Sequence, residues 1–231
     1  MKLFELVGVK GQKDKDLLQL IKDLDEVKFK KAGEGVAAQV FEVNGMIYKF
    51  WAKDSAYEKF IEFVEKNQDN PHLPKLKSKV KEIRTFFKKP QGFPDTIKYV
   101  KMEKLDPITY HEKIHGTKNV FIVDIINKIY YSIDHKSEFR EVESLAKEAE
   151  GSKLSDQSLK EIKGLYDTFV QMYDKIPGIN KMLADLHAGN MMKRGNTIVI
   201  TDPLIDTKDF HFNETMARQL QALHKEQNAN K

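Results

Sequence analysis

Two carboxylates and an amide in the last quarter of the sequence are spaced so that they could bind a metal ion together. Asp185 and Asn190 are five positions apart in a glycine-containing loop, and Asp202 follows twelve positions after Asn190. Short apolar runs on either side of Gly195-Asn196 predict a hairpin that would return Asp202 to Asn190. Because Mg²⁺ prefers oxygen ligands, we predict that Asn190 and Asp202 bind Mg²⁺. Asp185 could then accept a hydroxyl proton or orient a nucleophile.

A glycine pair and a lysine in the first quarter of the sequence could bind phosphate. Gly33 and Gly35 stand between two predicted strands, where the lack of a Cβ lets backbone N–H groups approach phosphate oxygens. Lys49 lies in the next predicted strand among apolar and aromatic neighbours. The alternation of a strand does not decide which face carries Lys49, so an outward-facing lysine is the alternative. Lys49 is therefore a candidate, and the resemblance described next implies that it is a phosphate-binding and catalytic residue.

These two regions together resemble the phosphotransferases of the protein-kinase-like superfamily. The segment Gly33–Val40 is similar to the kinase glycine-rich loop, with Ala38 at the third glycine. Asp185 matches the catalytic-loop aspartate, Asn190 the metal-binding asparagine, and Asp202 the aspartate of the D-F-G motif. The resemblance implies transfer of the γ-phosphoryl group of ATP, with Mg²⁺ as the metal.

The loop around Asp185 looks like two particular branches of the superfamily. The form Asp185-Leu186-His187-Ala188-Gly189-Asn190 is more similar to aminoglycoside and choline kinases than to protein kinases, which carry Lys at the position of His187. The longer forms Asp185–Met192 and Ile200–Pro203 resemble the early-gene serine/threonine kinases of T-odd bacteriophages, and Asn70–Pro74 is similar in placement. That second resemblance implies a phage kinase that phosphorylates host proteins in the host cytoplasm.

The resemblance also implies which residues would bind ATP. Lys49 would hold the α- and β-phosphates, and the backbone of Glu103 and Leu105 would contact the adenine edge. The glycine-rich loop and the apolar contacts of the adenine ring would come from Gly33, Gly35, Val40, Ile47, Met102 and Met192. In the kinase pattern a helix glutamate pairs with Lys49, and Glu58 is preferred here over Glu62 and Glu65. The alternatives are that Glu58 lies on the solvated face of the helix and that this chain has no such pair.

Departures from the kinase pattern leave the substrate open. Leu183-Ala184 replace the His-Arg before the catalytic aspartate, and Pro203-Leu204 replace Phe-Gly after Asp202. No Ala-Pro-Glu motif follows, and the remaining sequence predicts no peptide-docking platform. We predict a serine/threonine protein kinase. The alternatives are a small-molecule kinase of the aminoglycoside or choline type, and an inactive kinase-like module that binds and inhibits a host partner.

Composition excludes several other classes. The 231 residues are 40% hydrophobic and 32% charged, which suits a packed domain rather than a disordered chain. A net charge of +4 with mixed signs gives no specific nucleic-acid signal, and no apolar run is long enough to span a membrane. The absence of cysteine excludes disulfides and thiolate chemistry. We therefore predict a cytoplasmic protein.

Hydrophobic periodicity predicts an α+β chain. The expected strands are Lys28–Ala32, Ala37–Val43, Met46–Ala52, Val80–Phe87 and Thr96–Glu103. The expected helices are Asp14–Leu24, Ser55–Asn67, Ile108–His115, Asn119–Ile133, Ser137–Glu150 and Ser158–Lys175. We predict a single, compact, bilobal protein-kinase-like domain over residues 1–231. An antiparallel β N-lobe (1–104) and a reduced helical C-lobe (105–231) would bind ATP between them.

Overall fold

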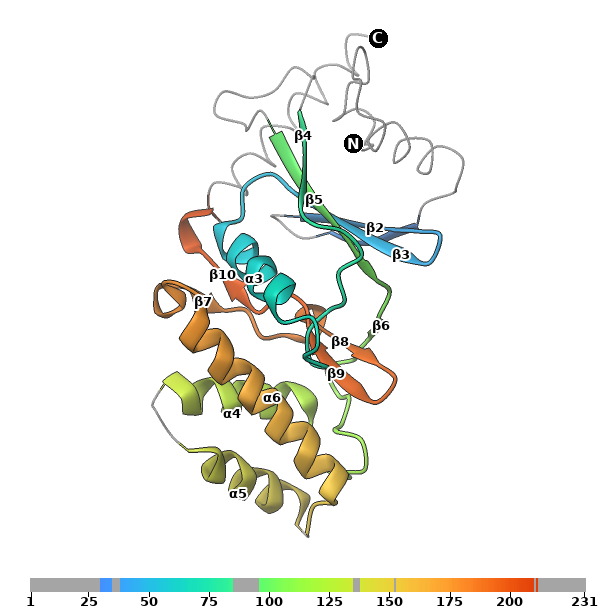
Figure 1. Ribbon diagram of the computed structural model, residues 1–231. Helices are drawn as coiled ribbons and strands as arrows, with labels where there is room; N and C mark the ends of the chain where they lie inside the picture. Colours follow the sequence, from blue (N-terminus) through green and yellow to red (C-terminus); the bar gives the residue numbers. More distant parts are fainter. Residues whose placement is uncertain are drawn as a thin grey trace, which may run out of the picture. The chain divides into compact units, whose positions relative to one another are not determined.

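The structure, a computed structural model, describes residues 30–34, 38–84, 96–134, 138–151, 153–209 and 211. The predicted helix at Asp14–Leu24 lies outside these residues. The chain divides into two compact units, each made of segments that are separate in the sequence. Figure 1 labels the helices and strands that belong to them. Unit 1 takes its described residues from Met1–Ser55, Leu76–Lys104 and Thr207–Lys231, and unit 2 from Ala56–Lys75 and Leu105–Asp206. The helix after Ser55, which precedes the predicted lobe boundary in sequence, therefore belongs to unit 2.

Unit 1 contains a five-stranded antiparallel sheet in the order β1-β2-β3-β5-β4. Its strands are β1 (Lys30–Glu34), β2 (Ala38–Val43), β3 (Met46–Trp51), β4 (Lys81–Arg84) and β5 (Thr96–Glu103). Asn44 and Gly45 connect β2 to β3 with φ values of 50° and 73°. Positive φ at both positions is typical of a type I′ turn, whose twist matches that of the strands it joins.

One face of this sheet is aromatic. The register places Phe41 opposite Tyr48 and Phe50 opposite Tyr99, so these four buried side chains share a face. The rings of Phe50 and Tyr99 are stacked with centroids 5.4 Å apart, and Phe41 meets Phe50 edge-on at 5.9 Å. Residues that alternate with these point to the opposite face.

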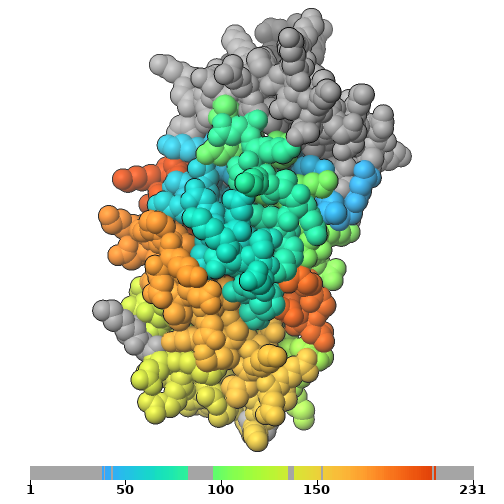
Figure 2. Space-filling view, viewed as in Figure 1, coloured from blue at the N-terminus to red at the C-terminus, as the bar shows by residue number. Residues whose placement is uncertain are grey.

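Unit 2 contains most of the helical residues that the structure describes. They lie in α3 (Ser55–Lys66, from Ala56 onward), α4 (Ile122–Asp134), α5 (Phe139–Glu150) and α6 (Asp156–Lys175). Helix α6 packs against α4 and α5, and their contact buries Ile126, Ile129, Val142, Ala146, Ile162, Leu165 and Phe169. The Ser155 hydroxyl caps α6 by accepting the Ser158 N–H at 3.1 Å. Asn70 connects the end of α3 to α6 through the Thr168 hydroxyl at 3.0 Å, and the two helices lie side by side in Figure 2.

Short strands complete unit 2. Strands β6 (Asp106–Pro107), β8 (Met191–Arg194) and β9 (Thr197–Ile200) form one small sheet, and β7 (Leu183–Ala184) pairs with β10 (Leu204–Ile205) in another. Two short 3₁₀ turns, Ile179–Lys181 and Ala188–Asn190, lie before β7 and before β8. Within the described ranges, no helix combines the length and hydrophobicity that a membrane crossing requires.

The predicted α+β fold, with an antiparallel sheet and a helical part, is confirmed, but one predicted helix is wrong. Ile108–His115 forms turns rather than a helix, and Lys113 makes an isolated bridge to Phe121. The backbone before this segment is held in β6, where Asp106 lies opposite Lys193 and Pro107 opposite Met192. This pairing, which links positions more than eighty residues apart in the sequence, replaces the local helix that the apolar spacing favours.

The first turn of α3 is capped from a distant part of unit 1. Ser55 is the first residue of α3, and its N–H donates to Asp209 Oδ2 at 2.8 Å. The other carboxylate oxygen lies 3.3 Å from Lys53 Nζ, and Asp209 is only 7% exposed. A buried carboxylate at a helix N-terminus satisfies a free N–H group and complements the helix dipole.

Replacing Asp209 with alanine should lower the free energy of unfolding by about 1–2 kcal/mol at neutral pH. Burial raises the pKa of the Asp209 carboxyl, but hydrogen bonds from Ser55 and Lys53 lower it by more, so the pKa lies below its ordinary value. The contribution is therefore present above the unfolded-state pKa of about 3.9 and is lost as the pH falls through the folded-state value. Urea unfolding at several pH values measures the effect. Thr207→Ala, an exposed neighbour, is the control, and an equal loss from Asp209→Ala at acid pH would contradict the carboxylate's role.

Candidate functional site

The loop that carries Asp185 is tied to the segment that carries Asp202. Strand β7 leads into Asp185, whose N–H donates to the Pro203 carbonyl at 2.9 Å. Next to this bond, Ala184 pairs with Leu204 in the β7–β10 ladder. The backbone therefore holds the two aspartates in neighbouring segments of unit 2.

Asn190 connects the same two aspartates through both its side chain and its backbone. Asn190 Nδ2 donates to Asp185 Oδ2 and to the Asp185 carbonyl, each at 2.8 Å. The Asn190 carbonyl accepts the N–H groups of Thr201 at 3.0 Å and of Asp202 at 3.4 Å. The hairpin of β8 and β9, which turns at Gly195 with a φ of 59°, brings these residues back to Asn190. The structure thus brings Asp185, Asn190 and Asp202 together.

The chemistry of these side chains fits a hard divalent cation. Because Asn190 donates both of these side-chain hydrogen bonds from Nδ2, its side-chain oxygen is the atom that could act as a metal ligand. Asp202 is half-buried and supplies a carboxylate. The described residues contain no group of three His, Asp or Glu side chains that could enclose a metal. A Mg²⁺ ion at Asn190 and Asp202 would take its other ligands from water and phosphate, as Mg²⁺ commonly does.

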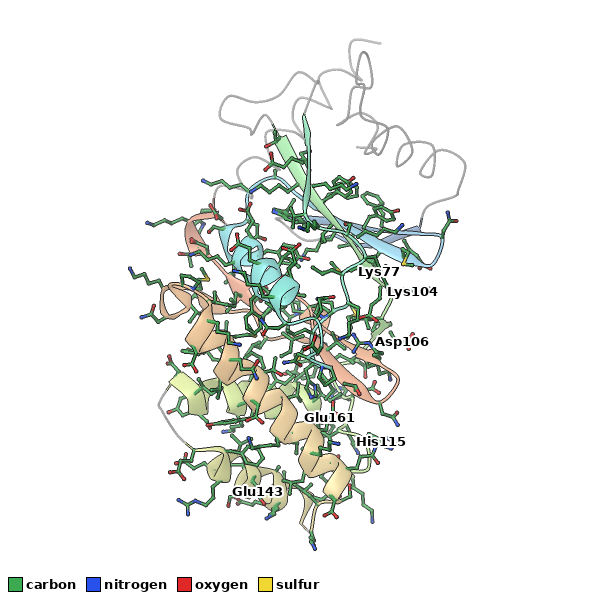
Figure 3. The ribbon with its side chains drawn as sticks, viewed as in Figure 1. Lys77, Lys104, Asp106, His115, Glu143 and Glu161 are labelled. Atoms are coloured by element: carbon green, nitrogen blue, oxygen red, sulfur yellow. The ribbon has the colours of Figure 1, made fainter. Side chains whose placement is uncertain are left out.

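A buried histidine that the sequence did not single out supports the hairpin. His72 Nδ1 lies 3.0 Å from the Ile198 carbonyl, and the His72 carbonyl accepts the Ile200 N–H at 2.9 Å. The Ile198 N–H in turn donates to Glu161 Oε1 at 2.7 Å. Glu161 belongs to α6 and is labelled in Figure 3. His72 therefore hydrogen-bonds β9 through both its ring and its backbone, and β9 is the strand that leads to Asp202.

Helix α6 has a glycine at the position where the ring of His72 packs against it. A Cβ placed on Gly164 would lie 2.3 Å from His72 Nε2, far inside any real contact. His72 is 5% exposed and is bonded as described above, so its ring cannot easily move away. Arg194 fixes the same loop from β8, because it donates to the Pro71 carbonyl at 2.8 Å and the Leu73 carbonyl at 3.0 Å. The sequence indicated only that the loop carrying His72 follows a predicted helix, and it marked no role for His72 itself.

In unit 1, the strand register places Lys49 with three residues of the predicted nucleotide site. Lys49 lies opposite Val40, and Ile47 lies opposite Met102. Opposed residues share a face, and so do residues two apart in one strand, so all four belong to the face opposite the aromatic one. Lys49 is 8% exposed, which removes the alternative of an outward-facing, solvated lysine.

The remaining predicted nucleotide residues are distributed over both units. Gly33 lies in β1 opposite Val40, beside a register shift between Lys31 and Gly33, and Gly35 lies outside the described residues. Glu103 ends β5 in unit 1. The residues that belong to unit 2 are Leu105, Met192 in β8, and the α3 glutamates Glu58 (half-buried) and Glu62 (exposed).

Comparison with known proteins finds structural neighbours only. No protein-family profile and no curated protein sequence matches the chain. The complex of APH(2'')-IIa with gentamicin is 16% identical with a TM-score of 0.35, and covers 88% of this chain and 74% of its own. Spectinomycin phosphotransferase APH(9)-Ia with ADP and spectinomycin is 15% identical with a TM-score of 0.35, over 84% and 71%. The ADP-bound aminoglycoside phosphotransferase APH(2'')-Ib is 14% identical with a TM-score of 0.31, over 87% and 74%. Similarity this low does not show that the chain acts on the substrates of these phosphotransferases.

Proposed function

We propose that this chain is an ATP- and Mg²⁺-dependent phosphotransferase that transfers the γ-phosphoryl group of ATP to a hydroxyl group. The observation that carries the proposal is the connection through Asn190, which hydrogen-bonds the Asp185 carboxylate with its side chain and the Asp202 backbone with its carbonyl. Asn190 thereby links the candidate base, Asp185, to the other candidate metal ligand, Asp202. A module that only binds a partner has no need of this arrangement.

The proposed chemistry depends on positioning and on charge. Asp185 orients the acceptor hydroxyl and accepts its proton, because one of its oxygens is already fixed by Asn190. Bound to Asn190 and Asp202, Mg²⁺ would neutralise charge on the β- and γ-phosphate oxygens. Lys49 supplies a positive charge for the α- and β-phosphates from a buried strand position. Val40, Ile47 and Met102 give the same face of the sheet its apolar character for the adenine ring.

Among acceptors, we favour a small molecule that carries a hydroxyl group. The Asp185–Asn190 loop has the form of the small-molecule kinases, with His187 in place of lysine. The chain after Asp202 also enters β10 within two residues and pairs with β7, so the segment that would follow D-F-G in a regulated protein kinase is here a paired strand. A serine or threonine side chain of a host protein is the second candidate. It is supported by the phage-kinase forms of Asp185–Met192 and Ile200–Pro203.

ATP should bind at least about tenfold more weakly when Mg²⁺ is removed, because the carboxylate of Asp202 would otherwise repel the phosphates. Isothermal titration calorimetry with Mg²⁺ and with excess chelator measures this difference. Asp202→Ala should abolish the dependence on Mg²⁺, whereas Asp206→Ala, a carboxylate four residues later, should retain it. Equal ATP affinity with and without chelator in the unmodified chain would remove the metal role from Asn190 and Asp202.

The acceptor class can be tested directly with γ-labelled ATP. The chain is incubated with Mg²⁺ and either a panel of aminoglycosides and amino alcohols or a bacterial lysate, and labelled products are separated by size. The proposal expects label in the small-molecule fraction. Label that appears only in protein bands, as acid-stable phosphoserine or phosphothreonine, would favour the second candidate. Asp185→Asn is the negative control in both arms.

A further inference from the structure

We propose that His187 is a positioning residue that holds the Asp185 carboxylate through an N–H group at Nε2. The inference rests on the phosphotransferase function proposed above and goes beyond it. It assigns a task to a side chain that the sequence marked only as a difference between kinase branches. His187 lies two residues after Asp185, at the start of the turn that leads to Asn190.

The position of the imidazole proton follows from one hydrogen bond. The Gly189 N–H donates to His187 Nδ1 at 3.0 Å. A ring nitrogen that accepts a hydrogen bond does not carry a proton, so the proton of the neutral ring is at Nε2. His187 Nε2 lies 3.5 Å from Asp185 Oδ1. A donor therefore faces the carboxylate oxygen that Asn190 does not contact. Such contacts are often long in the absence of substrate and tighten when it binds.

Gly189 makes this orientation of the ring possible. A Cβ at Gly189 would lie 2.8 Å from His187 Cε1 and 3.0 Å from Nδ1, so the ring occupies the space that any other residue would need. Gly189 does not have a positive φ, so its backbone conformation does not itself require glycine. The close approach of the His187 ring is the physical reason for a glycine at this position.

The two contacts fix the Asp185 carboxylate from both sides. Oδ2 accepts from Asn190 at 2.8 Å, and Oδ1 faces His187. The Asp185 side chain is 40% exposed, so without a partner Oδ1 would be free to rotate and bind water. A carboxylate held in one orientation keeps its remaining lone pairs directed at an incoming hydroxyl. Loss of that orientation lowers the rate of transfer rather than the affinity for nucleotide.

A merely structural role for His187 makes the opposite prediction, and two substitutions separate the roles. His187→Asn places an acceptor near the position of Nδ1, which keeps the bond to Gly189, but it lacks a donor that reaches Asp185. His187→Gln places an amide N–H near the position of Nε2, which keeps the donor, but it loses the acceptor for Gly189. The probe is the slow release of labelled phosphate from γ-labelled ATP to water in the presence of Mg²⁺, which needs no knowledge of the acceptor.

We expect His187→Asn to lower kcat by about tenfold to a hundredfold with the KM for ATP unchanged, and His187→Gln to stay within about threefold of the unmodified chain. If His187→Asn retains kcat while His187→Gln loses it, the residue only closes the turn and the proposal is wrong. Unchanged kcat in both variants also overturns it.

Asp185→Asn in the same assay separates this inference from the proposed function. An Asp185→Asn variant as active as the unmodified chain defeats the phosphotransferase assignment. An inactive Asp185→Asn beside a fully active His187→Asn defeats only the role of His187. Gly189→Ala gives a second measurement, since its Cβ should displace the ring. It should lower kcat in the unmodified chain and cause no further loss in His187→Asn, and additive losses would contradict the mechanism. Calorimetric binding of ATP with Mg²⁺ verifies that each variant is folded.

Discussion

Phosphoryl transfer should fall by about two to four powers of ten when Asp185 is replaced with asparagine, while ATP and Mg²⁺ still bind. Asparagine has the size of aspartate, and its oxygen can still accept the 2.8 Å bond from Asn190. It cannot accept a proton from the acceptor hydroxyl, so transition-state stabilisation of about 3–5 kcal/mol is lost. Release or transfer of label from γ-labelled ATP measures the rate, and calorimetry measures nucleotide affinity.

The matched control for this variant is Asp206→Asn, which removes a carboxylate from the same unit outside the loop. Its transfer rate should remain within about threefold of the unmodified chain, as for most substitutions away from reacting atoms. Undiminished transfer in Asp185→Asn would show that the catalytic assignment is wrong. A biological effect that persists in Asp185→Asn without any transfer would instead favour the inactive binding module.

Lys49→Met should lower kcat/KM for ATP by about a hundredfold, the usual effect of removing one preorganised charge that stabilises a developing anion. Methionine is similar in length, and Lys49 lies between Val40 and Val100 in the sheet, so an apolar side chain fits there. A cooperative thermal transition would show that the variant is folded. Steady-state assays at subsaturating ATP and thermal unfolding give the two readouts.

Lys101→Met is the matched control for Lys49→Met because it removes a lysine from the opposite face of the same sheet. Lys101 lies opposite Tyr48, and its Nζ is 5.3 Å from the centre of the Tyr48 ring. Its removal should cost a small amount of stability and no activity. Wild-type turnover in Lys49→Met, or an equal loss in both variants, would contradict the phosphate-binding role of Lys49.

Elements that depend on neighbouring residues could be predicted from the sequence. The Asn44-Gly45 pair required positive φ at two successive positions, and the structure has the turn and both flanking strands there. The apolar spacing after Ser55 predicted α3, which ends one residue before Asn67. In both cases the deciding interactions lie within a few residues of one another, so a local pattern contains them.

Features that depend on distant contacts were missed. The segment at Ile108–His115 has a helical pattern, yet pairing of Asp106 and Pro107 with β8 determines its path. The cap of α3 comes from Asp209, which is 154 positions from Ser55. No local spacing marks either partner, because each is brought into place only by the folded chain.

The candidate site divides in the same way. The spacing of Asp185, Asn190 and Asp202 contained enough information to predict that they meet, because a short hairpin separates the last two. The strand alternation could not decide the environment of Lys49, which the register with β2 and β5 determines. His72 gave no chemical signal at all, since its contacts with β9 and α6 exist only in three dimensions.

The contact between His72 and Gly164 has a consequence for sequence variation. A glycine inside a helix such as α6 costs about 1 kcal/mol relative to alanine, so a change to alanine would ordinarily be favoured. Here alanine would place its Cβ 2.3 Å from the His72 ring, and the two positions are therefore coupled. In homologues of this chain, a larger residue at position 164 should accompany a smaller one at position 72. Such a pair of correlated columns would identify the loop that supports the Asp202 strand without any structure.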